Sequence, residues 1–186
     1  MTEADRSGHT TAAETGDSTG PGSLVVVCGL PGVGKTTVAM RIADHLDSEI
    51  LRTDVIRKSL FDDPSYTADE TAAVYDALIR RARERLVTGV SVVLDATFAD
   101  ATFRRNARAM GEQVAESFDL VEVACDESVV KRRIEQRDGI SDADFQVHLH
   151  FREEFDRIEP DHLVIDNSRN EAATFAQVDA AFGCER

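Results

Sequence analysis

The chain has 186 residues and a hydrophobic content of 42%, which fits one globular domain with a sizeable core and excludes a wholly disordered chain. No apolar run approaches the roughly 18 residues that a membrane-spanning helix requires, and the N-terminus lacks the basic and apolar regions of a signal peptide. We therefore expect a cytoplasmic protein without a membrane partner. Acidic residues outnumber basic ones 35 to 21, and the formal net charge of −14 disfavours non-specific binding to nucleic acid, although an acidic surface can surround a basic cleft.

The basic residues are mainly arginine, because only Lys35, Lys58 and Lys131 are lysines. Together with the excess of Asp and Glu, this composition resembles that of salt-adapted haloarchaeal proteins, in which salt screens the repulsion between like charges. An acidic interaction surface is the alternative, but the acidic residues are spread along the whole chain. We therefore expect a halophilic protein.

Residues 1–22 are rich in Ser, Thr, Gly, Asp and Glu without apolar periodicity, and we expect them to be a disordered leader to a domain that spans residues 23–186. Apolar runs and segments of helical spacing then alternate along the chain. Strands are predicted at residues 24–28, 49–52, 90–94, 120–124 and 162–165. Helices are predicted from residue 35, from Thr67 to Gly89, and over residues 103–114, 126–137, 141–160 and 172–182.

This alternation predicts an α/β protein with a five-stranded parallel sheet between two helix layers, which is a three-layer αβα arrangement. In such a sheet, ligands bind beyond the carboxyl ends of the strands. Four polar groups follow predicted strands and should converge there. They are the Gly-rich loop after residue 28, Asp54 with Arg57, Asp95 with Thr97, and Asn167 with Ser168.

The segment at residues 29–36, GLPGVGKT, matches the phosphate-binding pattern G-x-x-x-x-G-K-[ST] in every specified position. Its glycines let successive N–H groups point inward and leave no Cβ in the way of a phosphate. Lys35 would reach the β- and γ-phosphates, the Thr36 hydroxyl would bind magnesium, and Thr37 would donate to the α-phosphate. The predicted nucleotide-binding residues here are Gly29, Pro31, Gly32, Val33, Gly34, Lys35, Thr36 and Thr37. This pattern predicts binding of a nucleoside triphosphate.

Five segments, GLPGVGKTT, RTDVIRK, VVLDATF, RRIEQRDGISDAD and HLVIDNS, together resemble the small P-loop kinases. More narrowly, they resemble the predicted ATP-dependent kinases of the zeta-toxin and polynucleotide-kinase-like group, often labelled AAA family ATPases. The resemblance covers nearly all of residues 24–183. It implies ATP and magnesium as cofactors and an acceptor hydroxyl as the second substrate.

Asp54 lies three residues before Arg57, a spacing that puts both side chains on one face of a helix. A kinase needs a carboxylate to take the proton of the acceptor hydroxyl and a nearby cation to hold the acceptor. In the family that the chain resembles, the Asp of this motif is the proposed base, so the resemblance gives Asp54 that role and Arg57 a role in positioning substrate. The alternative is that Asp54 only caps its helix.

Asp95 ends an apolar strand, which is the usual position of the second acidic residue of P-loop proteins, where it would hold magnesium with Thr36. In the kinases that the chain resembles, the same position can face the acceptor instead, and a purely structural capping role is a third reading. On the next predicted helix, Arg104, Arg105 and Arg108 are candidates for contact with the acceptor.

Arg133 and Arg137 are one helical turn apart and precede a flexible Asp138-Gly139 pair. This segment resembles the lid of small kinases, here expected around residues 126–145, whose arginines close over the phosphates. A solvated basic face is the alternative. By the same resemblance, Asn167 and Ser168 would line the adenine pocket.

These features favour an ATP-dependent phosphotransferase that acts on a hydroxyl of a small molecule or nucleotide. A regulatory P-loop ATPase or GTPase switch and a polynucleotide 5′-end kinase are the alternatives. Against a GTPase switch, no Asn-Lys-x-Asp guanine-specificity motif follows any predicted strand. The identity of the acceptor is left open by the sequence.

Overall fold

The computed structural model describes residues 20–136, 142–159 and 161–183. Within them, five parallel strands form one sheet in the order β2-β3-β1-β4-β5. The strands are β1 (Leu24–Cys28), β2 (Glu49–Arg52), β3 (Val92–Asp95), β4 (Phe118–Ala124) and β5 (Leu163–Asp166). The helices are α1 (Lys35–Leu46), α2 (Thr53–Leu60), α3 (Ala68–Leu86), α4 (Ala101–Val114), α5 (Glu127–Glu135), α6 (Asp142–Glu154) and α7 (Glu171–Phe182). The predicted α/β architecture with a five-stranded parallel sheet is confirmed.

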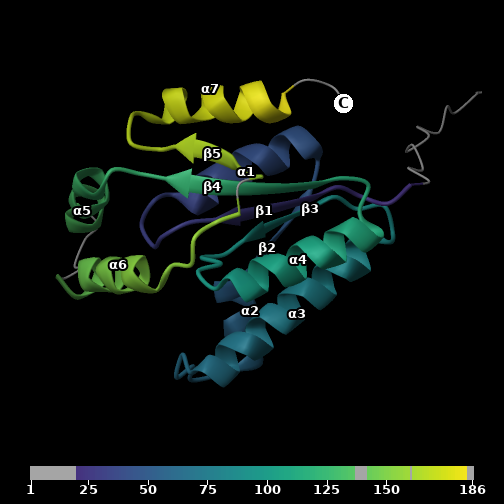
Figure 1. The fold of residues 1–186 in the computed structure, drawn as a ribbon, viewed down its shortest axis with the longest axis horizontal. Coiled ribbons are helices and arrows are strands. Elements are labelled where there is room, and N and C mark those ends of the chain that lie inside the picture. The colour runs from purple at the N-terminus through teal and green to yellow at the C-terminus, as the bar shows by residue number, and fades with distance from the viewer. Residues whose placement is uncertain (1–19, 137–141, 160, 184–186) are drawn as a thin grey trace, which may run out of the picture.

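Helices cover both faces of the sheet (Figure 1). The side chains of β1 accordingly alternate between two cores, one on each face. Val25 and Val27 pack with α1 and α7 on one face, whereas Leu24 and Val26 pack with α3 and α4 on the other. Every residue of β1 is fully buried. The central strand therefore accounts for the unbroken apolar run that the sequence showed.

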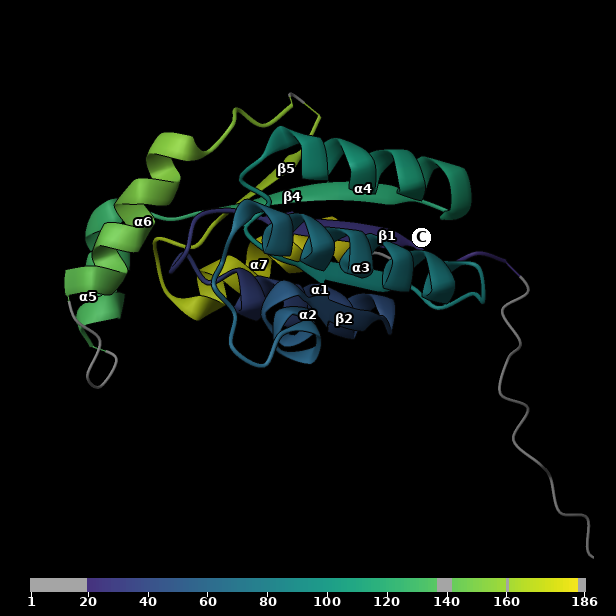
Figure 2. The same cartoon turned by 90° about the horizontal axis from the view of Figure 1, so that it is seen from below.

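The loops after β1 and β3 lead to helices on opposite faces of the sheet, α1 on one side and α4 on the other. Because β1 and β3 are neighbours, their carboxyl ends form the crevice in which parallel α/β sheets bind ligands. Figure 2 shows α5 and α6 beyond this end of the sheet, paired with each other rather than layered on a face.

Helix α6 ends at Glu154, well before Pro160, so the prediction of one helix that continues to that proline is wrong. The cause lies in the buried Arg104 of α4, whose guanidinium donates to the carbonyl oxygens of Asp156 (3.1 Å) and Arg157 (2.9 Å). These two carbonyl oxygens accept hydrogen bonds from Arg104 instead of from N–H groups of a continuing helix, so the segment after α6 is held against the start of α4. The other element boundaries differ from the predicted ones by a few residues.

The predicted leader lies largely outside the described residues, but Gly22, its last residue, is bonded into the domain. Its N–H donates to the Leu86 carbonyl (3.0 Å), and its own carbonyl accepts from the N–H of Glu116 (3.0 Å). Residues 137–141 of the predicted lid also lie outside the described part.

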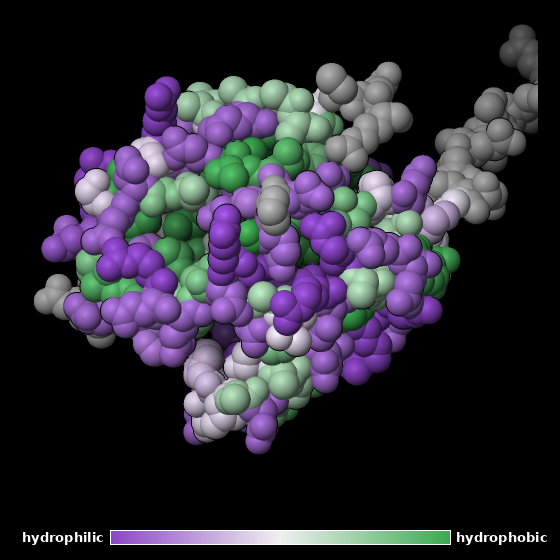
Figure 3. Space-filling model, in the orientation of Figure 1, coloured by the Kyte–Doolittle hydropathy of each residue, from purple (hydrophilic) through white to green (hydrophobic). Residues whose placement is uncertain are grey.

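On the face shown in Figure 3, hydrophilic side chains cover most of the surface, in keeping with a sequence in which 30% of residues are charged. Among the described helices, none has the length and apolar character needed to cross a membrane.

Candidate functional site

The Gly-rich loop between β1 and α1 lies at the carboxyl end of the central strand. Its glycines Gly29, Gly32 and Gly34 all have positive φ angles, of 140°, 85° and 94°. At Gly34 a side chain is excluded twice, because a Cβ would lie 2.3 Å from Nδ2 of Asn167 and because that φ is unfavourable for other residues. The structure thus gives a physical reason for glycine at the position that the sequence pattern requires.

Lys35 begins α1 and folds back over the loop, so that its Nζ donates to the Leu30 carbonyl at 2.9 Å. Burial lowers the pKa of Lys35 from 10.5 to about 8, and the negative charge of Asp95 offsets part of this effect. A phosphate bound in the loop would stabilise the charge of this partly desolvated ammonium.

Thr36 and Asp95 meet at the crevice between β1 and β3. The Thr36 hydroxyl donates to Oδ2 of Asp95 at 2.6 Å, and Asp95 is only 6% exposed. The register of β1 and β3 explains this contact, since Asp95 lies opposite Val27, just before the Gly-rich loop begins. A hydroxyl and a carboxylate oxygen are ligands that magnesium prefers, so the residues present fit this ion.

Arg52, which the sequence analysis did not single out, lies between two of the predicted site carboxylates. Its Nη2 donates to Oδ2 of Asp54 (2.8 Å), and its Nε lies 3.7 Å from Oδ2 of Asp95. Arg52 ends β2 and is in register with Asp95, and this pairing of two strand ends is the signal that could have identified it.

Asp54 lies in the first turn of α2, and its side chain is 55% exposed. The N-cap position of α2 is Arg52, and one oxygen of Asp54 accepts from the N–H of Val55 at 2.9 Å. Asp54 is therefore accessible from solvent, and Arg52 lies between the carboxylates of Asp54 and Asp95.

Arg57 is separated from Asp54 despite the helical spacing that predicted a shared face. Its guanidinium is buried against α3, where it donates to the Thr71 hydroxyl (3.3 Å) and pairs with Glu70 (3.6 Å). The ring of Tyr66 covers the same guanidinium at 4.7 Å. Arg57 thus braces α2 against α3 in this conformation instead of standing free beside Asp54.

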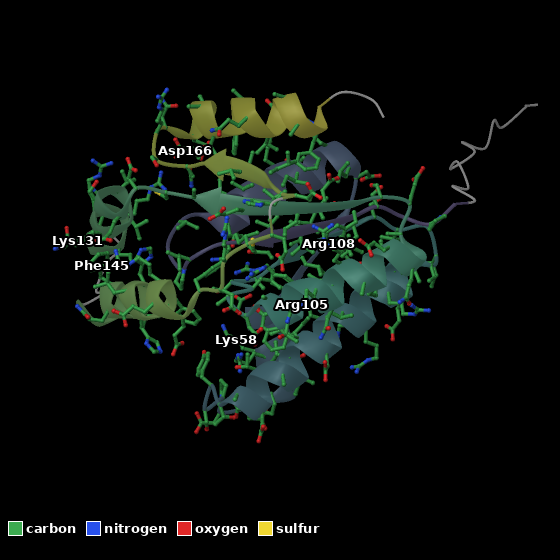
Figure 4. All side chains as sticks on the ribbon, in the orientation of Figure 1. Lys58, Arg105, Arg108, Lys131, Phe145 and Asp166 are labelled. Carbon is green, nitrogen blue, oxygen red and sulfur yellow. The ribbon has the colours of Figure 1, made fainter. Side chains whose placement is uncertain are left out.

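The arginines of α4 are similarly engaged. Arg104 is 2% exposed and bonds to backbone carbonyls, so it is part of the core rather than a contact for an acceptor. Arg105 and Arg108, labelled in Figure 4, donate to the Thr102 hydroxyl (3.1 Å) and to the Asp161 carbonyl (3.1 Å). The structure brings none of the three into the crevice by a described contact with Asp54 or Asp95.

Arg133 and Ser168 lie together where α5 meets the loop after β5. Arg133 donates weakly to Sγ of Cys125 (3.5 Å) and to the Arg169 carbonyl (3.4 Å). The Ser168 hydroxyl accepts from the N–H of Asp126 at 2.9 Å. Arg137, the second predicted lid arginine, lies outside the described residues.

Asn167 does not present its side chain to an open pocket as expected of an adenine contact. It is 6% exposed, its Nδ2 donates to the Val33 carbonyl (2.7 Å), and its Oδ1 accepts from the Thr174 hydroxyl (2.8 Å). Both ends of this amide are bound to the protein itself, and its contact with adenine stays a prediction. Asn167 supports the phosphate-binding loop from behind.

His148 of α6 makes a matching contact that sequence reasoning missed. It is 2% exposed, and its Nδ1 lies 2.8 Å from the carbonyl oxygen of Pro31. The sequence offered no signal for this contact, since His148 lies on a helix with a weak apolar pattern and 117 residues from its partner.

The sequence of this chain is similar to one protein family and to several known proteins. The model of a family described as AAA domain matches residues 24–158. The uncharacterized protein Rv2004c of Mycobacterium tuberculosis (strain ATCC 25618 / H37Rv) is 30% identical over 139 residues, which is 67% of this chain and 28% of that protein. The uncharacterized protein Mb2027c of Mycobacterium bovis gives the same values. The chain thus spans about 28% of the length of the curated relatives it matches.

Solved structures of kinases share the fold. A sugar kinase from Janibacter sp. HTCC2649 superposes with a TM-score of 0.67 at 22% identity, covering 86% of this chain and 94% of that one. A gluconokinase from Sinorhizobium meliloti 1021 gives a TM-score of 0.62 at 23% identity, with 88% and 94% covered. The APS kinase CysC of Mycobacterium tuberculosis, in complex with AMPPNP and APS, gives a TM-score of 0.70 at 20% identity, with 88% and 97% covered.

Proposed function

Since the chain belongs to the AAA domain family, we propose that it is a small P-loop kinase that transfers the γ-phosphoryl group of ATP to a hydroxyl of a small molecule or nucleotide. The observation that carries this proposal is the 2.6 Å contact between Thr36 and Asp95 beside the buried end of Lys35. These three side chains would hold the phosphates and a magnesium ion at the carboxyl ends of two neighbouring strands.

On the donor side, Lys35 would bind the β- and γ-phosphates as a point charge, while Thr36 and Asp95 would hold the metal. Bound there, magnesium would neutralise part of the charge on the phosphate oxygens. Arg133 and Arg137 are proposed to close over the transferring group from the lid.

On the acceptor side, the exposed carboxylate of Asp54 would take the proton of the acceptor hydroxyl. The acceptor oxygen then bonds to the γ-phosphorus, the bond from that phosphorus to the bridging oxygen breaks, and ADP leaves with the electron pair. Arg52 would hold the Asp54 carboxylate in place through its hydrogen bond. Arg57 would position substrate only after leaving its contacts with α3, so its direct role is secondary in this proposal.

Membership of the zeta-toxin and polynucleotide-kinase-like group and a salt-adapted, haloarchaeal origin are part of the same proposal. The five sequence segments support the first, and the excess of acidic residues with few lysines supports the second. The acceptor is left as a hydroxyl compound. The names of the structural neighbours suggest which classes to try first: sugars, sugar acids and adenylyl sulfate.

The test is acceptor-stimulated formation of ADP from ATP and magnesium in molar salt, with a panel of these acceptors and with RNA 5′ ends. We expect one class to raise turnover in the wild type, D54N to abolish the increase while still binding ATP, and K35A to lose both. The control D76N changes an exposed carboxylate on α3 and should behave as wild type. Slow hydrolysis that no acceptor stimulates and that D54N does not alter would favour the regulatory NTPase instead.

A further inference from the structure

Three carbonyl oxygens of the phosphate-binding loop each accept a hydrogen bond from a side chain of a different part of the fold. The donors come from the start of α1, from α6 and from the loop after β5. The pairs are Lys35 with Leu30 (2.9 Å), His148 with Pro31 (2.8 Å) and Asn167 with Val33 (2.7 Å). The first pair belongs to the phosphate-binding pattern itself, and the other two come from segments far away in sequence.

The contact of His148 fixes the proton on one ring nitrogen. Because a carbonyl oxygen only accepts, Nδ1 must carry the hydrogen that it donates to Pro31. The ring is buried and stacks on that of Phe145 at 5.7 Å between centroids. Phe145 in turn contacts Lys131 of α5, 5.6 Å from the ring centroid, and Figure 4 shows these two residues at the α5–α6 pair.

The contact of Asn167 is oriented by a second bond. Thr174 of α7 is fully buried and donates to Oδ1 of Asn167, which leaves Nδ2 to face Val33. The N–H of Asn167 is itself bound to the Ala124 carbonyl at 2.8 Å, so the main chain that carries the amide is fixed to the end of β4. The amide therefore has one orientation in which every bond is made.

Each of these bonds also aims an N–H group. In a trans peptide the carbonyl of one residue and the N–H of the next point in opposite directions. A carbonyl of Pro31 held toward His148 therefore turns the N–H of Gly32 to the other side, and a carbonyl of Val33 held toward Asn167 does the same for Gly34. Both glycines have positive φ angles and little conformational restraint of their own. The bonds from His148 and Asn167 therefore restrain the peptide groups that carry the N–H of Gly32 and the N–H of Gly34.

We propose that His148 and Asn167 are positioning residues that hold the N–H groups of Gly32 and Gly34 toward the phosphates. Through His148, the docking of the α5–α6 pair on the loop is coupled to nucleotide affinity. The proposal rests on the nucleotide-binding half of the proposed function and does not require phosphoryl transfer.

The experiment measures the Kd of a non-hydrolysable ATP analogue by calorimetry for variants of His148. We expect H148A to weaken binding about tenfold, because it leaves the Pro31 carbonyl without its donor and the loop without its restraint. H148N should stay within about threefold of wild type, since the Asn Nδ2 is the same number of bonds from Cα as the His Nδ1. H148Q places its amide one bond further out and should resemble H148A. The matched control is H150A, which removes an exposed histidine of the same helix.

Variants of Asn167 test the proposal independently of His148. N167D replaces the donor to Val33 with a carboxylate oxygen, and we expect a larger loss of affinity than for N167A. Amide hydrogen exchange of residues 29–35 without nucleotide should speed up in H148A and N167A but not in H150A. This readout reports the loop even if a variant loses all measurable binding.

The outcomes separate the two proposals. Variants that bind and exchange like wild type, or an H148N protein that is no better than H148A, overturn this inference and leave the kinase proposal standing. A wild type that binds the analogue, with the expected order of variants, but transfers no phosphoryl group contradicts only the proposed function. A wild type that does not bind the analogue contradicts both.

Discussion

Replacing Lys35 with methionine should stabilise the nucleotide-free protein at neutral pH, although it removes the central cation of the site. Burial lowers the pKa of Lys35 to about 8 in the folded chain, against 10.5 for an unperturbed lysine. At 1.36 kcal/mol for each pH unit, this difference corresponds to about 3 kcal/mol in favour of the unfolded state at neutral pH. The side chain of Lys35 is only partly buried by its surface area, and its Nζ keeps a hydrogen bond to the Leu30 carbonyl. We therefore expect the free energy of unfolding of K35M to exceed that of the wild type by about 1–2 kcal/mol.

The sign of the pH dependence follows from proton binding. Below pH 8 both states carry the proton, so the penalty on the folded state is complete. Between pH 8 and 10.5 the unfolded chain binds more protons than the folded one, so this lysine makes the free energy of unfolding rise with pH. Above 10.5 both states are neutral and the penalty is gone.

Two other buried groups titrate in the opposite sense. Burial raises the pKa of the Cys28 thiol from 9.0 to about 12 and that of the Tyr75 hydroxyl from 10.0 to about 12. Their unfolded forms lose protons first, so they reduce the stability of the fold above pH 9 and above pH 10, respectively. The interval from pH 8 to 9 is therefore the one in which Lys35 dominates.

Urea unfolding of wild type and K35M at half-unit steps from pH 7 to 10 measures this directly. The excess stability of K35M should shrink steadily as the pH rises above 8. K58M, which removes an exposed lysine of α2, should not change the pH dependence. A K35M protein that is no more stable than wild type at pH 7, or an excess that is constant with pH, would refute the desolvation argument.

Three further substitutions test other contacts. G34A should reduce the affinity for a non-hydrolysable ATP analogue by at least about tenfold, because its Cβ would lie 2.3 Å from Nδ2 of Asn167 at a φ of 94°. Calorimetry against the wild type measures this loss, and an unchanged affinity would contradict the prediction. R104M should lower the free energy of unfolding in urea by about 2–4 kcal/mol, since four backbone carbonyls lose their donor; a loss below about 1 kcal/mol would mean that water replaces it. D179N should lower the thermal midpoint at pH 6, because the carboxylate accepts from Arg41 and its pKa is held at about 2 in the folded chain. Below pH 3.8 the unfolded chain takes up the proton first, so this contribution to stability declines between pH 3.8 and 2 and the difference should be smaller at pH 3.

The fold was predictable because its determinants are local. Val25 to Cys28 form an apolar run that only a strand buried on both faces accommodates, and the Gly-rich loop that follows has a backbone pattern that few structures other than a phosphate-binding loop use. The helix start at Thr67 was predicted for the same reason, since its hydroxyl accepts from the N–H of Glu70 three residues later. Alternation of such elements leaves few topologies other than a parallel sheet.

The supports of the site were not predictable because they depend on contacts between distant segments. Asn167 and Pro31 each have a partner more than 110 residues away, and nothing in the local sequence of His148 indicates a carbonyl to bind. Arg104 was one of three arginines predicted as candidates for contact with the acceptor, yet it is buried because the segment after α6 crosses it. A charged residue is expected to be exposed unless its partners are known, and the partners of Arg104 are four backbone carbonyls and the Glu159 carboxylate.

Arg57 shows how a correct motif can still mislead about geometry. The spacing from Asp54 is right for one helix face, but α2 presents that face partly to solvent and partly to α3. Asp54 takes the open side and Arg57 the covered one, where Glu70 supplies the opposite charge. Spacing fixes the angle between two side chains, whereas the neighbouring helix decides what each of them meets.

Arg52 changes how the two halves of the site should be understood. Its guanidinium approaches Asp54 on one side and Asp95 on the other, so the proposed base and the proposed metal ligand share one cation. Any positive charge that arrives at Asp95 weakens the hold of that carboxylate on Arg52 and leaves the guanidinium free to bind Asp54 more strongly. The register of β2 and β3 places Arg52 beside Asp95, and the side-chain contacts of Arg52 make the two halves of the proposed site depend on one cation.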